Sequence, residues 1–410
     1  MIAGWRCAVC RATVDVATPH PFVCPVATPA DRHHALHPLQ VGVEEEVLDD
    51  ANPFVAYGPR LAWWAFARAH GMTEGACTAL TRDVAAGFAV TPFTHDTTLT
   101  DRLGVDVWIK DETANIGGSH KGRHLVTILL HLRAAEALRL GPVGGRRPLA
   151  IASCGNAAIA AATLAQRSEW PLRVFVPEWA SPDALTRIED LGASITACPR
   201  LPGDAPGDPA LLRLREAVAA GAVPFSVQGP ENALCLDGGR TIGWEISDAL
   251  CAAGERPLDR AVVQVGGGAF ATCMGWGLGT DVRLDAMQTA GCAPLARAWR
   301  RAAELGLGPG DVASRWDELM TPWNDPYSVA DGILDDETYD WLGVFAVMAR
   351  SGGHPLVAQE SAVEEAHELA RSTGIDVSTT GSAGLAGLLL ADGAPAPGER
   401  VAVVFSGVAR

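Results

Sequence analysis

Apolar and polar positions follow two alternating patterns along the chain from about residue 59 onward. Short apolar runs with the period of a strand are followed by longer segments with the period of a helix. Residues 105–109 alternate like a strand, and residues 119–140 form a long amphipathic helical pattern with Ser119 as its expected N-cap. This alternation predicts an α/β fold, in which parallel sheets carry helices on both faces.

The same two patterns recur through the rest of the chain. The other expected strands lie at residues 148–152, 172–176, 194–197, 223–227, 261–265, 282–287 and 401–405. The other expected helices lie at residues 60–70, 157–166, 182–191, 210–220, 239–252, 269–278, 360–371 and 383–390. Residues 1–50 differ, because they show little periodicity and are rich in cysteine, histidine and proline.

Composition narrows the class of protein. At about 150 residues per domain, 410 residues predict two or three domains. The net charge of −16, with no run of five basic residues, lacks the basic face that nucleic acids or anionic membranes require. We therefore expect neither partner.

The sequence also bears on the compartment. Residues 148–166 carry no formal charge but include proline, serine, glycine, asparagine and glutamine, so we do not expect a membrane span. The N-terminus lacks the pattern of a signal peptide, and ten cysteines are too few for a disulfide scaffold of this length. These features predict a cytoplasmic protein with reduced cysteines.

Four loops that follow expected strands have an unusual composition, and the first carries a lysine. Residues 110–123 join a strand to the long helix and place Lys121 in its first turn. The helix macrodipole disfavours a cation there, which favours a neutral amine suited to nucleophilic chemistry. An exposed lysine at a solvated helix start is the alternative.

The second loop is Ser153, Cys154, Gly155 and Asn156, between a strand and an alanine-rich helix. Its N–H groups and polar side chains suit a carboxylate or phenolate oxygen. A simple capped helix start explains the same residues equally well.

The third loop is Gly266, Gly267, Gly268 and Ala269, whose backbone can close on a phosphate at a helix N-terminus. It also fits a dinucleotide-binding fingerprint, because Asp285 lies 285 − 266 = 19 residues beyond it, near the expected acidic position. A plain tight turn is a third interpretation.

The fourth loop, Ser406 after the last strand, says little alone. Taken together, the four loops supply the parts that hold pyridoxal 5′-phosphate (PLP). Lys121 would form the Schiff base, the glycines would bind the phosphate, and a further group would face the ring nitrogen.

At these residues the chain resembles the fold-type II PLP enzymes, the group of threonine synthase, threonine/serine dehydratase and tryptophan synthase β. Residues 108–123 resemble the segment that bears the Schiff-base lysine, and residues 378–386 resemble a segment before the last helix. The resemblance covers roughly residues 90–410 in the expected order. It argues against the dinucleotide interpretation, which would not require the lysine and asparagine loops.

The resemblance implies a role for each loop. Lys121 would form the Schiff base, and Asn156 would contact the 3′-oxygen of PLP. The loop of Ser153, Cys154, Gly155 and Asn156 would also bind the substrate carboxylate. Gly266, Gly267, Gly268 and Ala269 would bind the phosphate, and Ser406 would face the pyridine nitrogen.

The resemblance further implies two open, twisted parallel-sheet domains of the tryptophan synthase β-like kind with an N-terminal extension. We expect an extension at residues 1–50, a large PLP-binding domain from 51–140 and 225–410, and a smaller domain at 141–224. We also expect a homodimer. One departure is that His120 and Gly122 flank the lysine where threonine synthases have phenylalanine and aspartate; a histidine before the lysine is similar to tryptophan synthase β.

The expected activity is a lyase that acts on a small amino acid by α,β- or β,γ-elimination. A neutral Ser406 hydroxyl would leave the ring a weak electron sink, which favours prompt loss of a substituent over transamination. Lys121 would act as the general base at Cα. A β-replacement synthase and a non-catalytic PLP-binding regulatory protein are the alternatives.

The N-terminal segment carries a second candidate site. Cys7, Cys10, His20 and Cys24 suit a structural Cys₃His zinc site. A second Cys-x-x-Cys motif is missing, and the possible substitutes are His33, His34 and His37. Free cysteines without an ion are the alternative.

Overall fold

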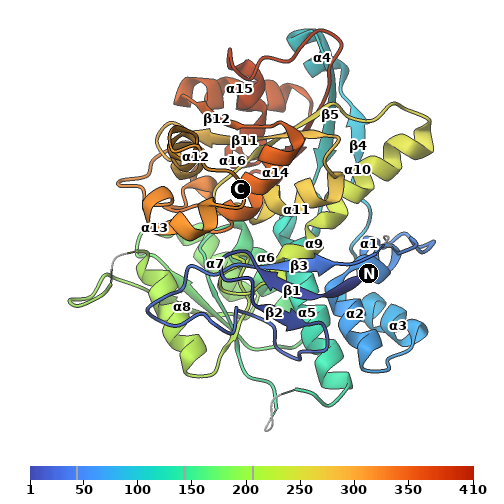
Figure 1. Cartoon of the computed structure of the whole chain (residues 1–410), viewed down its shortest axis with the longest axis vertical. Coiled ribbons are helices and arrows are strands. Elements are labelled where there is room, and N and C mark those ends of the chain that lie inside the picture. Colours follow the sequence, from blue (N-terminus) through green and yellow to red (C-terminus); the bar gives the residue numbers. More distant parts are fainter. Residues whose placement is uncertain (43–44, 142–144, 206) are drawn as a thin grey trace. The chain divides into compact units, whose positions relative to one another are not determined.

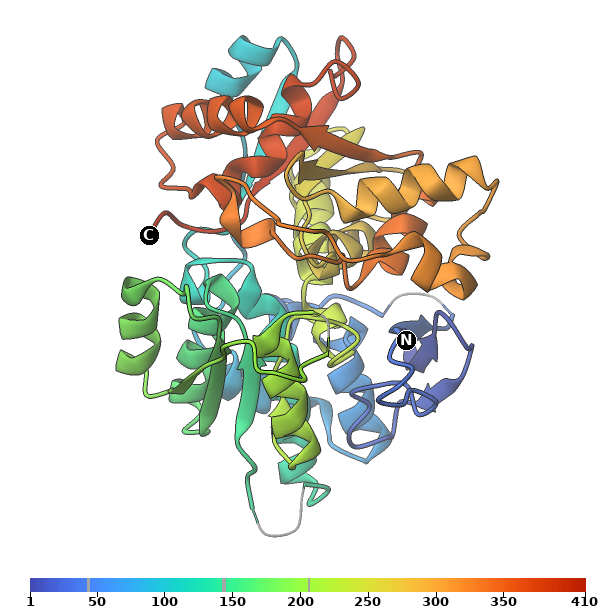
Figure 2. The same ribbon diagram turned by 90° about the vertical axis from the view of Figure 1, so that its left-hand side faces the viewer.

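The computed structural model describes residues 1–410 except 43–44, 142–144 and 206. The chain forms two compact units (Figures 1 and 2). Unit 1 contains residues 1–89 and 121–238, and unit 2 contains residues 90–120 and 239–410. None of the helices in the described ranges is long and apolar enough to cross a membrane.

This division differs from the expected domains. Residues 51–89 and the long helix group with the smaller sheet, and the second boundary falls after residue 238 instead of residue 224. The physical reason is packing, because helix α5 (Lys121–Ala137) contacts α2 (Ala62–Ala69), α3 (Glu74–Val84) and α6 (Asn156–Arg167), which all belong to unit 1.

Unit 1 is built on a four-stranded parallel sheet in the order β8-β7-β6-β9. The strands are β6 (Leu149–Ala152), β7 (Leu172–Val176), β8 (Ser194–Ala197) and β9 (Val223–Pro224). The connecting helices are α6, α7 (Pro182–Asp190) and α8 (Pro209–Ala219). Strand β7 is almost continuously buried, as expected for a strand covered on both faces.

Helix α5 is buried on nearly all sides and is not amphipathic as expected. Its polar side chains bond backbone carbonyl groups: His124 Nδ1 lies 2.8 Å from Cys235 O, and His131 Nε2 lies 2.8 Å from Pro19 O. Ser119 does not cap this helix, because α5 begins two residues later, at Lys121, and Ser119 pairs with Gly407 in an isolated β-bridge.

Residues 1–50 contain a small sheet that the sequence patterns do not predict. Strands β1 (Ile2–Cys7), β2 (Thr13–Asp15) and β3 (Leu36–Gln40) pair antiparallel in the order β2-β1-β3. The extension is therefore an ordered part of unit 1.

Unit 2 contains a six-stranded sheet in the order β12-β11-β10-β13-β5-β4, parallel except for the edge strand β4. The strands are β4 (Phe93–His95), β5 (Asp106–Asp111), β10 (Arg260–Gln264), β11 (Arg283–Thr289), β12 (Pro355–Ala358) and β13 (Arg400–Phe405). The predicted α/β class with parallel sheets is confirmed.

Helices cover both faces of this sheet. Val262 of β10 lies in an apolar core with α4 (Thr97–Leu103), α15 (Glu360–Ser372) and the 3₁₀ segment η5 (Ala383–Leu389). Strand alternation directs its buried neighbours Ala261 and Val263 to the other face. There α10 (Arg240–Ala253), α11 (Ala269–Leu278) and α14 (Trp341–Ser351) pack together.

The remaining helical elements are short or lie outside the two sheets. They are α1 (Pro53–Ala56), η1 (Gly58–Arg60), η2 (Ile116–Gly118), α9 (Cys235–Gly238), α12 (Pro294–Glu304), η3 (Val312–Arg315), α13 (Trp316–Leu319), η4 (Asp331–Ile333) and α16 (Thr379–Ser382).

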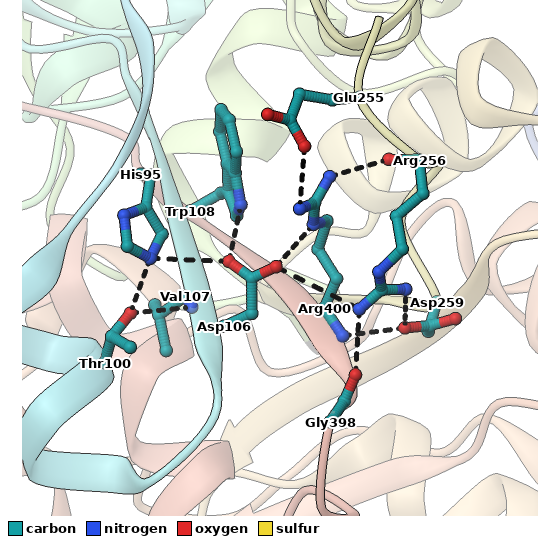
Figure 3. A network of polar contacts seen from close by, with 10 residues as sticks. All are labelled: His95, Thr100, Asp106, Val107, Trp108, Glu255, Arg256, Asp259, Gly398 and Arg400. Atoms are coloured by element: carbon teal, nitrogen blue, oxygen red, sulfur yellow. Dashed lines mark hydrogen bonds and ion pairs between the residues drawn. The ribbon is translucent and has the colours of Figure 1, made fainter.

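A polar network holds the amino ends of neighbouring strands of the large sheet (Figure 3). Asp106 begins β5 and accepts from Arg400 Nε at 2.5 Å and from Trp108 Nε1 at 2.8 Å. Arg400 begins β13, and its backbone N–H donates to Asp259 at 2.7 Å. The network lies at the amino edge of the sheet. The loops that carry the candidate site follow the strands at the opposite, carboxyl edge.

Candidate active site

Three neighbouring strands of unit 2, β10, β13 and β5, run parallel, so their carboxyl ends meet at one edge of the sheet. The loops that follow them contain Gly266 to Gly268, Ser406, and residues 112–120, which lead to Lys121. Ligands of open α/β sheets bind at this edge. The fold therefore places the glycine loop, Ser406 and the residues that lead to Lys121 at one edge of the sheet in unit 2.

The glycine loop joins β10 to α11. Gly268 has φ of 91°, and an added Cβ there would lie 2.8 Å from Thr338 Cγ2. An added Cβ at Gly266 would lie 2.5 Å from Asp335 Oδ2. Both positions therefore require glycine. No side chain caps α11 and its first turn carries no acid, so its N–H groups suit an anion.

Ser406 has a neighbour that the sequence analysis missed. Gln264 Nε2 donates to Ser406 Oγ at 2.7 Å and to Gly381 O at 2.8 Å, and it lies 3.3 Å from Val404 O. Because carbonyl oxygens only accept hydrogen bonds, the amide NH₂ must point toward this group of oxygens. Ser406 Oγ is then the acceptor, and its own hydrogen is directed elsewhere.

His120, the residue before Lys121, is fixed in unit 2. Its backbone N–H and its Nδ1 both approach Ser406 O, at 3.0 and 3.1 Å. Its ring lies against that of Phe270, in the first turn of α11, with centroids 4.2 Å apart and the ring planes tilted by 31°. His120, which directly precedes Lys121, thus contacts both the backbone of Ser406 and the helix that follows the glycine loop.

The chain contains two lysines, Lys110 and Lys121. Lys110 is fully buried, and its Nζ lies 2.5 Å from Glu245 Oε2 and 2.7 Å from Thr91 O. An amine engaged in such a buried pair is unsuited to act as a nucleophile. Lys121, half-buried at the first position of α5, is therefore the candidate amine. A lysine count would have strengthened the sequence analysis.

The asparagine loop lies in unit 1, after β6. Gly155 is the N-cap of α6, and Asn156 is its first residue. Ser153, Cys154 and Asn156 are partly exposed and Gly155 is exposed, so the start of α6 is open to a ligand. Its first turn has no acid. The contacts predicted for these residues with cofactor and substrate remain predictions.

The dinucleotide interpretation required the Asp285 carboxylate to bind a ribose hydroxyl, and its position in the structure excludes this role. Its side chain is fully buried, and its carboxylate lies 2.6 Å from Arg260 Nε and 2.9 Å from Arg283. It also accepts from the backbone N–H of His354 at 2.9 Å. This carboxylate is a structural group of the sheet.

The N-terminal cluster differs from the expected ligand set in one residue. Cys7, Cys10, Cys24 and His34 place one ligand atom each within 4.8 Å of one another. Cys7 Sγ lies 3.4 Å from His34 Nδ1. The expected ligand His20 is outside this cluster, and its ring stacks on that of Phe22 with centroids 5.5 Å apart. The cause is the pairing of β1 with β3, which brings His34 beside Cys7.

Comparison with known proteins gives one family match and several similar proteins. A family model described as pyridoxal-phosphate dependent enzyme matches residues 84–407. A Rattus norvegicus protein described as serine dehydratase-like is 31% identical over 180 residues, which cover 44% of this chain and 49% of the rat protein. The match thus spans about half the length of that curated relative.

The solved structures show the same fold at low identity. The processed form of threonine deaminase isoform 2 from Solanum lycopersicum is 16% identical, with a TM-score of 0.62 over 91% of this chain and 95% of the other. A maize serine racemase is 17% identical, with a TM-score of 0.62 over 81% and 92%. Since the family match runs from before the edge strand β4 through Ser406, the chain belongs to the pyridoxal-phosphate dependent enzymes.

Proposed function

We propose that this enzyme is a PLP-dependent lyase that eliminates a β- or γ-substituent from a small amino acid. The observation that carries the proposal is the contact between Gln264 and Ser406, which orients a neutral hydroxyl at the carboxyl edge of the large sheet. The names of the rat relative and of the threonine deaminase support a lyase, and the name of the maize racemase supports the shared family chemistry.

The donor set fits the cofactor. The uncapped start of α11 and the glycine loop supply backbone N–H groups for a phosphate, and the Ser406 hydroxyl has a hydrogen to donate to a ring nitrogen. PLP, when bound, supplies an electron sink for negative charge that develops at the substrate Cα. Lys121 provides the amine that would hold its aldehyde carbon.

The residues of the chain would then act as follows. Lys121 Nζ would accept the proton from the substrate Cα. The loop from Ser153 to Asn156 binds the substrate carboxylate through the N–H groups at the start of α6, and the Asn156 amide bonds the 3′-oxygen of the cofactor. The Ser406 hydroxyl would donate to the ring nitrogen without protonating it, which would weaken the electron sink and favour loss of the leaving group over transamination.

The lysine assignment has a direct test. Borohydride reduction of the PLP-loaded protein should attach the cofactor to one peptide, the one with Lys121. The Lys121→Ala variant should lose both the visible absorbance and turnover, whereas the double variant Lys110→Met with Glu245→Leu should still be labelled at Lys121. A label on Lys110 would overturn the assignment.

The reaction type needs product analysis. The holoenzyme is incubated with L-serine, L-threonine and O-phosphohomoserine, and keto acid, ammonia and D-amino acid are measured, with and without a thiol. We expect keto acid from at least one substrate. Appearance of D-amino acid alone would indicate a racemase, and a thioether product alone would indicate a replacement synthase. If unreduced holoenzyme shows no turnover, although a parallel sample is labelled by borohydride, the protein is a regulatory PLP-binding protein. Each of these three results contradicts the lyase proposal.

Two further proposals concern assembly and metal. We propose that the chain acts as a homodimer, and that a structural zinc ion binds to Cys7, Cys10, Cys24 and His34. The separation of 3.5 Å between the Sγ atoms of Cys10 and Cys24 is close to that of two thiolates on one tetrahedral zinc ion. Asp31 Oδ2 lies 3.4 Å from His34 Nε2, as is usual for the carboxylate that orients a zinc-bound imidazole.

A further inference from the structure

Unit 1 contains a cavity of about 650 Å³ that the proposed chemistry does not use. Most of its wall is apolar, and the apolar lining residues include Leu132 of α5, Trp170 and Val223. The volume falls within the range of sites for small organic ligands, roughly 300–1,000 Å³.

The cavity lies at the amino edge of the four-stranded sheet. Three of its lining residues, Arg147, Trp170 and Ala222, come one or two positions before strands β6, β7 and β9. Ser153 to Asn156 follow the carboxyl end of β6. The cavity is therefore separate, within unit 1, from the loop proposed to bind the substrate carboxylate.

Arginines gather at this cavity although the chain has a net charge of −16. Arg146 is satisfied, because its guanidinium bonds both oxygens of Glu136, at 2.7 and 3.1 Å, and stacks over Trp170 at 4.7 Å. Arg139 and Arg147 differ. Among the residues that the structure describes, no carboxylate lies within ion-pair distance of either one.

Arg147 is exposed, as is Arg139, and it lies beside other lining residues of the cavity. Its carbonyl oxygen accepts from Trp170 Nε1 at 2.8 Å, and its guanidinium lies close to Gly221, where an added Cβ would come within 2.9 Å of a guanidinium nitrogen. Burial and the charge of Arg147 both lower the pKa of His20, which also lines the cavity. The polar lining residues thus include three arginines and one carboxylate, that of Glu136, which is paired with Arg146.

We propose that this cavity binds a small carboxylic acid with an apolar body. The carboxylate pairs with Arg139 and Arg147, and the apolar body packs against Trp170, Leu132 and Val223. Guanidinium groups favour carboxylates through charge-assisted and bidentate hydrogen bonds, whereas the wall offers few groups for a second polar end. The site is independent of PLP chemistry, since none of its residues belongs to the loops assigned to the cofactor.

A pair of ligands that differ in charge tests the proposal. The PLP-loaded full chain is titrated by calorimetry with 3-phenylpropionate and, separately, with 3-phenylpropan-1-ol, while the tryptophan fluorescence of the protein is recorded. We expect the carboxylate to bind at least about tenfold more tightly than the alcohol, as the loss of one charge-assisted interaction predicts. Equal affinities, or no binding of the carboxylate, would overturn the proposal.

Variants then locate the ligand. Arg147→Gln should weaken binding of 3-phenylpropionate about tenfold, Arg147→Lys less, and Trp170→Leu should abolish the fluorescence response. The matched control is Arg173→Gln, an arginine of β7 that lies over Phe175 and outside the cavity, and it should bind as the wild type does. Asn156→Ala should also leave binding unchanged. Loss of binding in Asn156→Ala but not in Arg147→Gln would place the ligand at the proposed active site and contradict the inference.

Discussion

Gln264 and Ser406 lie 142 positions apart in the chain, yet the Gln264 amide donates to the Ser406 hydroxyl at 2.7 Å. Neighbouring parallel strands, β10 and β13, end side by side and create the contact. Because the amide hydrogens of Gln264 also face carbonyl oxygens, the hydroxyl cannot reverse its role without losing this bond. The glutamine therefore keeps the hydroxyl hydrogen of Ser406 directed away from itself and toward another acceptor.

This contact predicts a specific effect of Gln264→Leu. The hydroxyl of Ser406 becomes free to rotate, and the loss of about 1.4 kcal/mol of oriented hydrogen bonding should weaken PLP binding about tenfold and shift the visible band. Spectral titration with PLP measures both effects.

The control for this variant is Gln288→Leu. Gln288 is also buried, on the adjacent strand β11, and its amide bonds Val265 O and Thr338 Oγ1. Its loss should reduce stability by a similar amount without moving the cofactor band. If both variants shift the band equally, Gln264 has only a structural role.

The elements that the sequence predicted best share a physical feature. β7 and β8 have the expected bounds, as does α11, because apolar runs there stop at glycine, proline or polar residues. β4 and β12 were missed because one is a three-residue edge strand and the other a four-residue strand, too short to show a period.

The site was predictable only where its residues share a local motif. Lys121, the glycine loop and Ser406 each follow a strand, which the sequence shows directly. The partnership of Gln264 with Ser406 depends on the order of strands in the sheet, which local patterns do not encode. The choice of His34 over His20 likewise depends on the register of β1 against β3.

Metal analysis distinguishes these two histidines. We expect purified protein to hold about one zinc ion per chain, and His34→Ala or Cys10→Ser to lose it. His20→Ala is the matched control and should retain the ion. The opposite result for the two histidine variants would restore the ligand set expected from sequence.

Removal of the ion should also destabilise unit 1. Arg32, two residues before His34, lies 3.4 Å from the buried Glu231, and Phe22 O accepts from the backbone N–H of Ala233 at 2.7 Å. These contacts join the cysteine-bearing segment to the rest of the unit, so a strong chelator should lower the melting temperature. An unchanged melting temperature would contradict a structural ion.

The buried pair of Lys110 with Glu245 predicts a large loss of stability. Glu245→Gln removes the carboxylate that lies 2.5 Å from the fully buried Lys110 ammonium, which should cost about 3–5 kcal/mol of unfolding free energy. The double variant Lys110→Met with Glu245→Leu removes both charges and should recover most of that loss. Denaturant unfolding measures each value.

A surface pair provides the comparison for this prediction. Arg82 donates to Asp50 at 2.7 Å and lowers the pKa of that carboxyl group, but the arginine is largely exposed. Asp50→Asn should therefore cost less than about 1 kcal/mol. Equal losses in Asp50→Asn and Glu245→Gln would show that burial does not control the contribution of these pairs.

His131 of α5 should make the fold sensitive to mild acid. Burial lowers its pKa to about 4, despite the hydrogen bond to Pro19 O, whereas the unfolded chain titrates near pH 6.5. Above pH 6.5 both states are neutral and the residue adds no pH dependence. Between pH 6.5 and 4 the unfolded state binds the proton first, so stability falls with falling pH by about 3 kcal/mol in all.

The variant His131→Phe should remove this part of the acid sensitivity. A phenyl ring keeps the stacking on Phe66, where the ring centroids are 4.2 Å apart, and loses only the bond to Pro19 O. Urea unfolding at pH 7 and at pH 5 should show a smaller difference for the variant than for the wild type. Thr127→Val serves as the control, because it removes a hydrogen bond to Leu234 O from the same helix without removing a titrating group. If both His131→Phe and Thr127→Val show the same difference in stability between pH 7 and pH 5 as the wild type, the acid sensitivity arises elsewhere in the chain.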